Sequence, residues 1–140
     1  MRVMVLVKAN EESEAGVMPT SDELNEMGKF NDELVKAGIM LAADGLSSSA
    51  QGKRVRFDTK GGSTVIDGPF AETKELVAGF WVWEVASLEE AVEWLKRSPF
   101  RDTEVEIRRV SELADFGEAF TPEMQAKEQA LRDQVAAKQK

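Results

Sequence analysis

A chain of 140 residues, of which 42% are hydrophobic, has the size of one ordinary domain and can bury a core of its own. It contains no cysteine and no histidine, which excludes disulfides, thiolate metal sites and cysteine nucleophiles and leaves acid–base chemistry to Asp, Glu, Lys and Arg. The net charge of −8 and the isoelectric point near 4.7 argue against nucleic acid as the main partner, because phosphate binding needs clustered Lys and Arg.

The first half of the chain predicts a strand, a helix and a second strand. Val3–Val7 is a continuous apolar run, as in a strand buried on both faces, and residues 10–16 are predicted to form a polar loop. A helix is expected after the N-cap Thr20, with Glu23 completing a capping box and Gly38 at its C-terminal end. Its apolar stripe is Leu24, Met27, Phe30 and Leu34. Residues 39–43 then predict the second strand.

The second half of the chain predicts a hairpin and then again a strand, a helix and a strand. Residues 47–52 predict a loop, and residues 54–66 alternate around Gly61-Gly62 as in a β-hairpin. Residues 77–85 are the strongest strand signal in the chain. Ser87 predicts the start of a helix with the apolar stripe Leu88, Ala91, Val92 and Leu95, which ends at Ser98-Pro99. Residues 104–108 alternate as in a last strand with one wet face.

This order of elements predicts an α+β fold of the ferredoxin-like type, a split β-α-β arrangement with an inserted β-hairpin. Both helices then lie on one face of a four-stranded antiparallel sheet. The strand at residues 77–85 is apolar on both sides, with Trp81 and Trp83 on one face and Phe80 and Val82 on the other. Because a large apolar patch does not stay in water, we expect a homodimer with the two sheets packed face to face.

The segment from Ser111 onward is an addition to this core. Thr121-Pro122 is a helix start with Pro at the first position, and Met124, Leu131 and Val135 give that helix a thin apolar stripe. The predicted organisation is therefore a domain at residues 1–110 and a C-terminal helical extension at residues 111–140.

Residues 67–75, Asp-Gly-Pro-Phe-Ala-Glu-Thr-Lys-Glu, place a turn signal, an aromatic ring and four charged side chains between two strands, and are called the signature below. This run resembles the sequence after which the DGPF group of YCII-related proteins is named. Gly79-Phe80 on the next strand and Ala43–Leu46 at the end of the second strand are similar to that family as well. The resemblance covers about residues 1–110, and the tail resembles an extension found in a subset of these proteins.

The resemblance implies a dimeric α/β barrel built from ferredoxin-like units, and it implies no established activity, because most members of the group are uncharacterised. In the wider superfamily a His–Asp pair has been suggested as an acid–base site. This chain has no histidine, so that mechanism does not transfer to it.

Ionisable and aromatic side chains of the signature are the candidate site residues. The candidate ligand-binding residues are Asp67, Phe70, Glu72, Lys74 and Glu75. Asp67 and Asp44 are the candidate catalytic carboxylates, since two neighbouring carboxylates raise the pKa of one of them toward neutrality. Gly68 and Pro69 are interpreted as turn residues, and the charged run also fits a solvated face or an ion-pair network.

Three functions follow from these residues. The first is a homodimer that binds a small polar molecule in a pocket near the signature. The alternatives are a cofactor-free enzyme that performs proton transfer or elimination with a carboxylate base, and a structural or protein-interaction module. No cofactor and no metal site are predicted. No segment has the roughly 20 apolar residues of a membrane span and Met1–Lys8 is too short for a signal peptide, so we expect a soluble cytoplasmic protein without a membrane partner.

Overall fold

The computed structural model describes residues 1–139. The chain separates into two compact units, Met1–Arg109 and a second unit that begins at Val110. The strands of the first unit are β1 (Arg2–Lys8), β2 (Met40–Gly45), β3 (Lys53–Phe57), β4 (Ser63–Asp67), β5 (Val77–Glu84) and β6 (Val105–Arg109). Its helices are α1 (Glu11–Glu14), α2 (Ser21–Lys36) and α3 (Leu88–Leu95), with short 3₁₀ turns η1 (Ser49–Gln51) and η2 (Thr73–Glu75).

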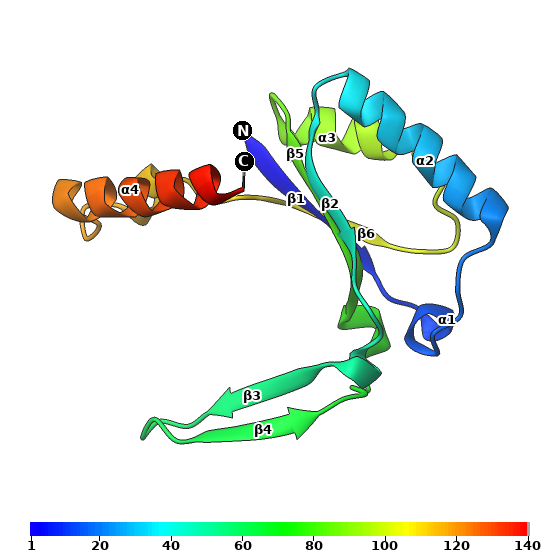
Figure 1. The fold of residues 1–140 in the computed structure, drawn as a ribbon, viewed down its shortest axis with the longest axis horizontal. Helices are drawn as coiled ribbons and strands as arrows, with labels where there is room; N and C mark the ends of the chain where they lie inside the picture. The colour runs from blue at the N-terminus through cyan, green and yellow to red at the C-terminus, as the bar shows by residue number, and fades with distance from the viewer. Residues whose placement is uncertain (140) are drawn as a thin grey trace. The chain divides into compact units, whose positions relative to one another are not determined.

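Four of these strands form one antiparallel sheet in the order β2-β5-β1-β6. Strands β1 and β2 are joined through α2, and β5 and β6 through α3, so each helix crosses over a strand that lies between the two it connects. Both helices lie on the same face of the sheet (Figure 1). The predicted split β-α-β arrangement with an antiparallel sheet is therefore confirmed.

The core lies between this face and the two helices. Trp83 is paired with Val3 and Trp81 with Val5, and all four side chains are buried. From α2, Phe30 packs edge-on against both indoles, with ring centroids 6.0 and 6.3 Å apart. The remaining members of the buried cluster are Leu34, Ile39, Val85 and Ala91. The aromatic half of β5 thus faces the helices.

The opposite face of the sheet carries Met4, Leu6, Phe80 and Val82, and is called the open face below. Strand pairing places Met4 beside Val82 and Leu6 beside Phe80, and the four side chains are half-buried. Within residues 1–109 no helix lies over them (Figure 1). The sequence predicted two apolar faces on this strand, and the structure assigns the tryptophans to the core and Phe80 and Val82 to the open face.

Strands β3 and β4 form a separate two-stranded hairpin, called the arm below, as the sequence predicts for residues 54–66. Nearly all of its side chains are exposed, Ile66 being half-buried. The arm leaves the sheet on the side away from α2 and α3 (Figure 1).

Two local expectations for the N-terminal half need correction. Residues 10–16 are not only a polar loop, because α1 begins after Asn10, whose side chain and that of Ser13 bond each other's backbone N–H. At the start of α2, Thr20 Oγ1 accepts from the Glu23 N–H at 3.2 Å, but the Glu23 carboxylate accepts from the Thr20 hydroxyl and not from its backbone. The N-cap is thus present without the full capping box.

A third correction concerns α3. Leu88 and Val92 of its expected apolar stripe are exposed, while Ala91 is fully buried and Trp94 and Leu95 pack against the core. The buried face of α3 is therefore rotated toward Ala91, because a small side chain lets the helix approach the tryptophan-filled sheet closely.

The second unit contains η3 (Leu113–Phe116) and α4 (Pro122–Lys138). Thr121 caps α4 by accepting from the Met124 N–H at 3.3 Å, and Pro122 occupies the first turn, as expected. The stripe of Met124, Leu131 and Val135 is exposed. Among residues 1–139, every helix is too short or too polar to cross a membrane.

Candidate functional site

A cleft of about 810 Å³ lies where β1, β2 and β5 meet the N-terminal half of α2. The loop between α3 and β6 and the segment around α1 complete its walls. Its aromatic and aliphatic lining includes Leu24, Met27, Trp81, Phe100, Pro19 and Pro99. Such a volume falls within the range of small-molecule sites.

Two rings and one amide define the inner part of this cleft. Trp81 and Phe100 lie edge to face with centroids 5.8 Å apart. The Trp81 Nε1–H donates to Asn31 Oδ1 at 3.0 Å, which satisfies a buried donor and holds the indole in one orientation. The cleft thus has a rigid aromatic wall with an amide beside it.

Polar side chains line the rest of the cleft. They are Lys8, Asn10, Ser13, Glu23, Glu26, Asn31, Asp44, Arg101 and Thr103. Arg101 Nη1 donates to the Phe100 carbonyl at 2.8 Å, which orients the guanidinium along the loop. The next residue, Asp102, adopts φ +50, a left-handed conformation that few residues other than glycine favour. Lys8 is paired with Glu106 at 3.2 Å.

The structure places most of the predicted site residues away from this cleft. Asp44 borders it at the end of β2, whereas Asp67, Phe70, Glu72, Lys74 and Glu75 do not line it. Asp67 pairs with Lys53 Nζ at 2.5 Å across the arm, and Glu75 lies 4.0 Å from Lys8 Nζ. Lys74 is exposed on η2. The two candidate catalytic carboxylates are thus held by different strands, Asp44 on β2 and Asp67 on β4.

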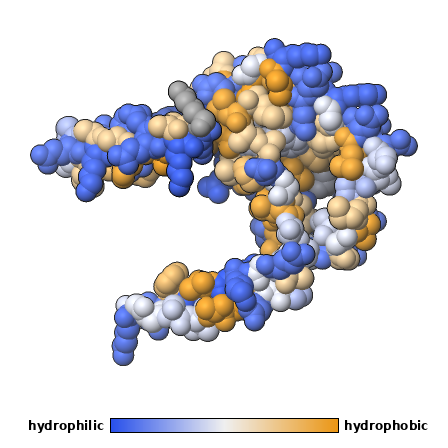
Figure 2. Space-filling model, in the orientation of Figure 1, coloured by the Kyte–Doolittle hydropathy of each residue, from blue (hydrophilic) through white to orange (hydrophobic). Residues whose placement is uncertain are grey.

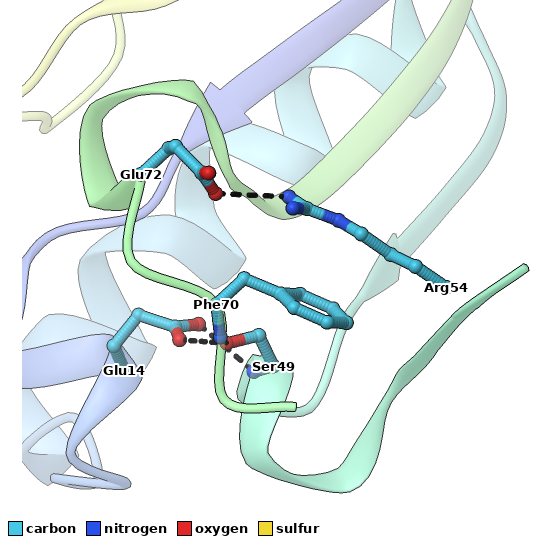
Figure 3. Close-up of polar contacts among 5 residues, drawn as sticks. All are labelled: Glu14, Ser49, Arg54, Phe70 and Glu72. Carbon is cyan, nitrogen blue, oxygen red and sulfur yellow. Dashed lines mark hydrogen bonds and ion pairs between the residues drawn. The ribbon is translucent and has the colours of Figure 1, made fainter. Parts of the chain in front are cut away.

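Phe70 and Glu72 belong instead to a set of contacts at the base of the arm, called the clasp below (Figure 3). The Phe70 N–H donates to Ser49 Oγ at 2.9 Å. The Arg54 guanidinium lies over the Phe70 ring, 3.9 Å from its centroid, and bonds Glu72 Oε2 at 3.1 Å. Glu14 completes the clasp by accepting from the Ser49 hydroxyl and, at 3.0 Å, from the Ser49 N–H.

The clasp connects the signature to the wall of the cleft. Glu14 is the last residue of α1, and the N-cap Asn10 and the neighbouring Ser13 of the same short helix line the cleft. Ser49 therefore holds the signature through Phe70 and holds α1 through Glu14. The signature itself does not line the cleft. It bonds Ser49, and Ser49 bonds Glu14 on the helix that contributes to the cleft wall.

A family model for the YCII-related domain matches residues 1–114. The chain belongs to the YCII-related family. A curated relative, an uncharacterized protein of Rhizobium meliloti (strain 1021), is 50% identical over 36 residues, which are 26% of this chain and 29% of that protein. The matched part therefore spans less than a third of the length of that relative.

Among solved structures, this YCII-related chain is similar to a 5-chloro-2-hydroxyhydroquinone dehydrochlorinase from Burkholderia phenoliruptrix AC1100, in complex with 2,5-dihydroxybenzoquinone. The TM-score is 0.46 at 16% identity, and the match covers 80% of this chain and 95% of that one.

Gly68 of the signature is required by a close approach of two backbone segments. A Cβ atom at this position would lie 1.7 Å from the Ser49 carbonyl oxygen. The Gly68 N–H donates to the Gly52 carbonyl at 3.0 Å, which closes the base of the arm next to the clasp. The predicted turn role of Gly68 thus becomes a specific packing requirement.

Glu72 is the signature residue with a shifted pKa. Its own backbone N–H holds the pKa of the carboxyl below its usual value, and the Arg54 guanidinium lowers it further by a hydrogen bond and by its charge. Because the pKa is lower in the folded chain than in the unfolded one, this contact contributes stability above the unfolded pKa and loses it as the pH falls through the folded pKa.

Sequence reasoning missed the residues that connect these parts. Asn31 continues the stripe of Leu24 and Met27 at helical spacing, and a polar side chain on an apolar stripe was the available signal for its contact with Trp81. Glu14 and Ser49 are 35 residues apart, and no spacing rule joins them. Arg101 and Phe100 lie in a loop whose sequence carries no motif.

The two alternative functions remain predictions. If the chain is an acid–base enzyme, the carboxylates that line the cleft are Asp44, Glu23 and Glu26. Asp67, the other predicted base, is paired with Lys53. If the chain is a structural or interaction module, the clasp holds the base of the arm in place through contacts within the chain. Among residues 1–139, no group of three or more acidic side chains is arranged to hold a metal ion.

Replacing Gly68 with alanine is expected to destabilise the first unit by about 2 kcal/mol or more, because backbone must move to admit the methyl group. The matched control is Gly28→Ala, where an added Cβ meets no atom within 4 Å on α2 and helix propensity favours alanine by up to ~1 kcal/mol. Urea unfolding at one protein concentration measures both. Equal stability of Gly68→Ala and the wild type contradicts the close approach.

Arg54→Met is expected to raise the pKa of the Glu72 carboxyl toward its ordinary value, since methionine keeps an apolar contact with Phe70 but removes the charge. Carboxyl NMR titration measures the pKa directly. The stability difference between wild type and variant should shrink as the pH falls through the folded pKa, because a protonated Glu72 no longer attracts Arg54. Arg56→Met on the same strand is the control and should leave the pKa of Glu72 unchanged.

Proposed function

We propose that this YCII-related chain binds a small polar molecule with an apolar surface in the cleft between α2 and the end of the sheet. The observation that carries the proposal is the convergence of a rigid aromatic wall, Trp81 and Phe100, with polar side chains from five separate segments on one concave space. Ligand sites combine apolar walls with a few fixed polar groups in this way.

The polar groups favour a ligand with both donors and acceptors. Arg101 and Asn31 offer N–H donors to a carboxylate, carbonyl or hydroxyl, and Glu23 and Asp44 offer acceptors. Trp81 is fixed by Asn31, so an apolar ring or chain in the cleft meets a preformed surface and little ordering entropy is lost on binding.

We also propose that the chain forms a homodimer through the open face, as the sequence suggests. Met4, Leu6, Phe80 and Val82 form a continuous apolar stripe over the two central strands, and a second copy is the cover that the same sequence supplies. Two sheets packed face to face in this manner make the dimeric α/β barrel that the family resemblance implies.

Ligand binding is tested by thermal shift with a panel of small aromatic and aliphatic carboxylates, phenols and amines. A binder at 100 times its dissociation constant stabilises the folded chain by about 2.7 kcal/mol. Met27→Trp is expected to abolish the shift because the indole fills the cleft. Val35→Trp is the matched control, since Val35 is exposed on the same helix outside the cleft. Binding that survives Met27→Trp places the ligand elsewhere and refutes the cleft proposal.

The dimer is tested by sedimentation velocity over a dilution series. Val82→Asp puts one carboxylate from each copy into the proposed interface, and we expect it to convert the dimer to a monomer, since a buried unpaired charge is strongly unfavourable. Val92→Asp changes an exposed valine on the helix side and should leave the dimer intact. A wild type that is monomeric at all concentrations overturns the dimer.

A further inference from the structure

The arm exposes an apolar surface that its own unit leaves uncovered. Direct partners across β3 and β4 share a face, so Val55, Val65 and Phe57 lie on one side of the arm. Their exposed fractions are 50%, 60% and 72%. A two-stranded hairpin with its apolar side in water is marginally stable alone, which indicates that this side is used for contact.

The arm also differs from the rest of the chain in charge. Residues 53–67 carry four basic side chains (Lys53, Arg54, Arg56 and Lys60) and two acidic ones (Asp58 and Asp67), a net charge of +2. Since the whole chain carries −8, the remainder carries −10. Outside its own arm, a second copy of this chain therefore carries a net charge opposite in sign to that of the arm.

The direction of the arm is fixed at its base. Arg54 of β3 is bound to Phe70 and Glu72 in the clasp, and Gly68, just after β4, is bound to Gly52, just before β3. These contacts hold the arm on the side of the sheet opposite to α2 and α3, which is the side of the open face (Figure 1). Figure 2 shows hydrophobic side chains gathered on the arm.

We propose that the arm is an interaction surface for a second copy of this chain, and that Phe57, Val55 and Val65 pack on that copy while it covers the open face. The inference rests on the proposed homodimer and adds a second contact region to it. One partner body reaches both surfaces because both lie on the same side of the first unit. The signature then has a defined task, since its clasp sets the angle at which the arm meets the partner.

An acidic protein of another kind would also complement the charge of the arm. A second copy is favoured because the same association that covers the open face brings the acidic remainder of the partner, with its net charge of −10, toward the basic arm. The Lys53–Asp67 pair marks the end of the apolar stripe nearest the sheet, and Lys60 lies in the turn at its far end. Lys60 is therefore well placed to meet a carboxylate of the partner.

Phe57→Ser is expected to weaken the dimer at least about tenfold in sedimentation velocity, because a phenyl ring buried only in the dimer is lost. Its fold should be intact, since the ring is mostly exposed within the protomer. Met18→Ser, at an exposed apolar residue outside the arm, is the matched control and should leave the dissociation constant unchanged.

A second measurement does not depend on a substitution. Unlabelled and ¹⁵N-labelled protein are mixed and treated with a carbodiimide, which joins Lys amines to carboxylates. Peptides that link Lys60 to an acidic residue are expected to combine one labelled and one unlabelled partner. If Phe57→Ser leaves the dimer unchanged and the Lys60 links occur only within one chain, the arm proposal is wrong while the open-face dimer stands. A monomeric wild type overturns both.

Discussion

The packing of β5 is the constraint on which the rest of the first unit depends. This strand hydrogen-bonds to β1 on one side and β2 on the other, and it is apolar on both faces. Its indoles fill one face so completely that α3 approaches through Ala91, and α2 meets them through Phe30 and Leu34. The same strand then has no polar face left for water. Its remaining side carries Phe80 and Val82, which are half-buried and have no helix of the first unit over them.

The cleft is a consequence of the same packing at the end of the sheet. Near the start of β5, Gly79 stands on the same face as Trp81 and Trp83 and places no side chain there, and it lines the cleft. Asn31 occupies the place on α2 at which another apolar residue would close the gap, and it uses its amide to bind the indole. An opening with a polar edge therefore follows from one glycine and one amide.

The signature acts at a distance from this opening. Ser49 joins it to α1 with one hydroxyl that accepts from Phe70 and donates to Glu14, which makes the arm, the signature and the cleft wall one connected unit. The acidic side chains of the signature have basic neighbours: Glu72 pairs with Arg54, Asp67 pairs with Lys53, and Glu75 lies near Lys8. In the structure, the run that looks most like a site in the sequence makes ion pairs and hydrogen bonds within the first unit.

The sequence by itself determined the strands, the longer helices, their order and the two-sided apolarity of β5, because these depend on periodicity and capping within short windows, but it did not reveal α1. It also placed the turn residues, including Gly68. Only the tertiary structure decided that the tryptophan face of β5 packs against the helices. It also decided that Asp44 lines the cleft while Asp67 belongs to the arm. Glu14, Ser49, Asn31 and Arg101 gained their roles in the same way, through contacts across long sequence separations. No local pattern encodes such contacts, since they arise when the sheet and helices pack.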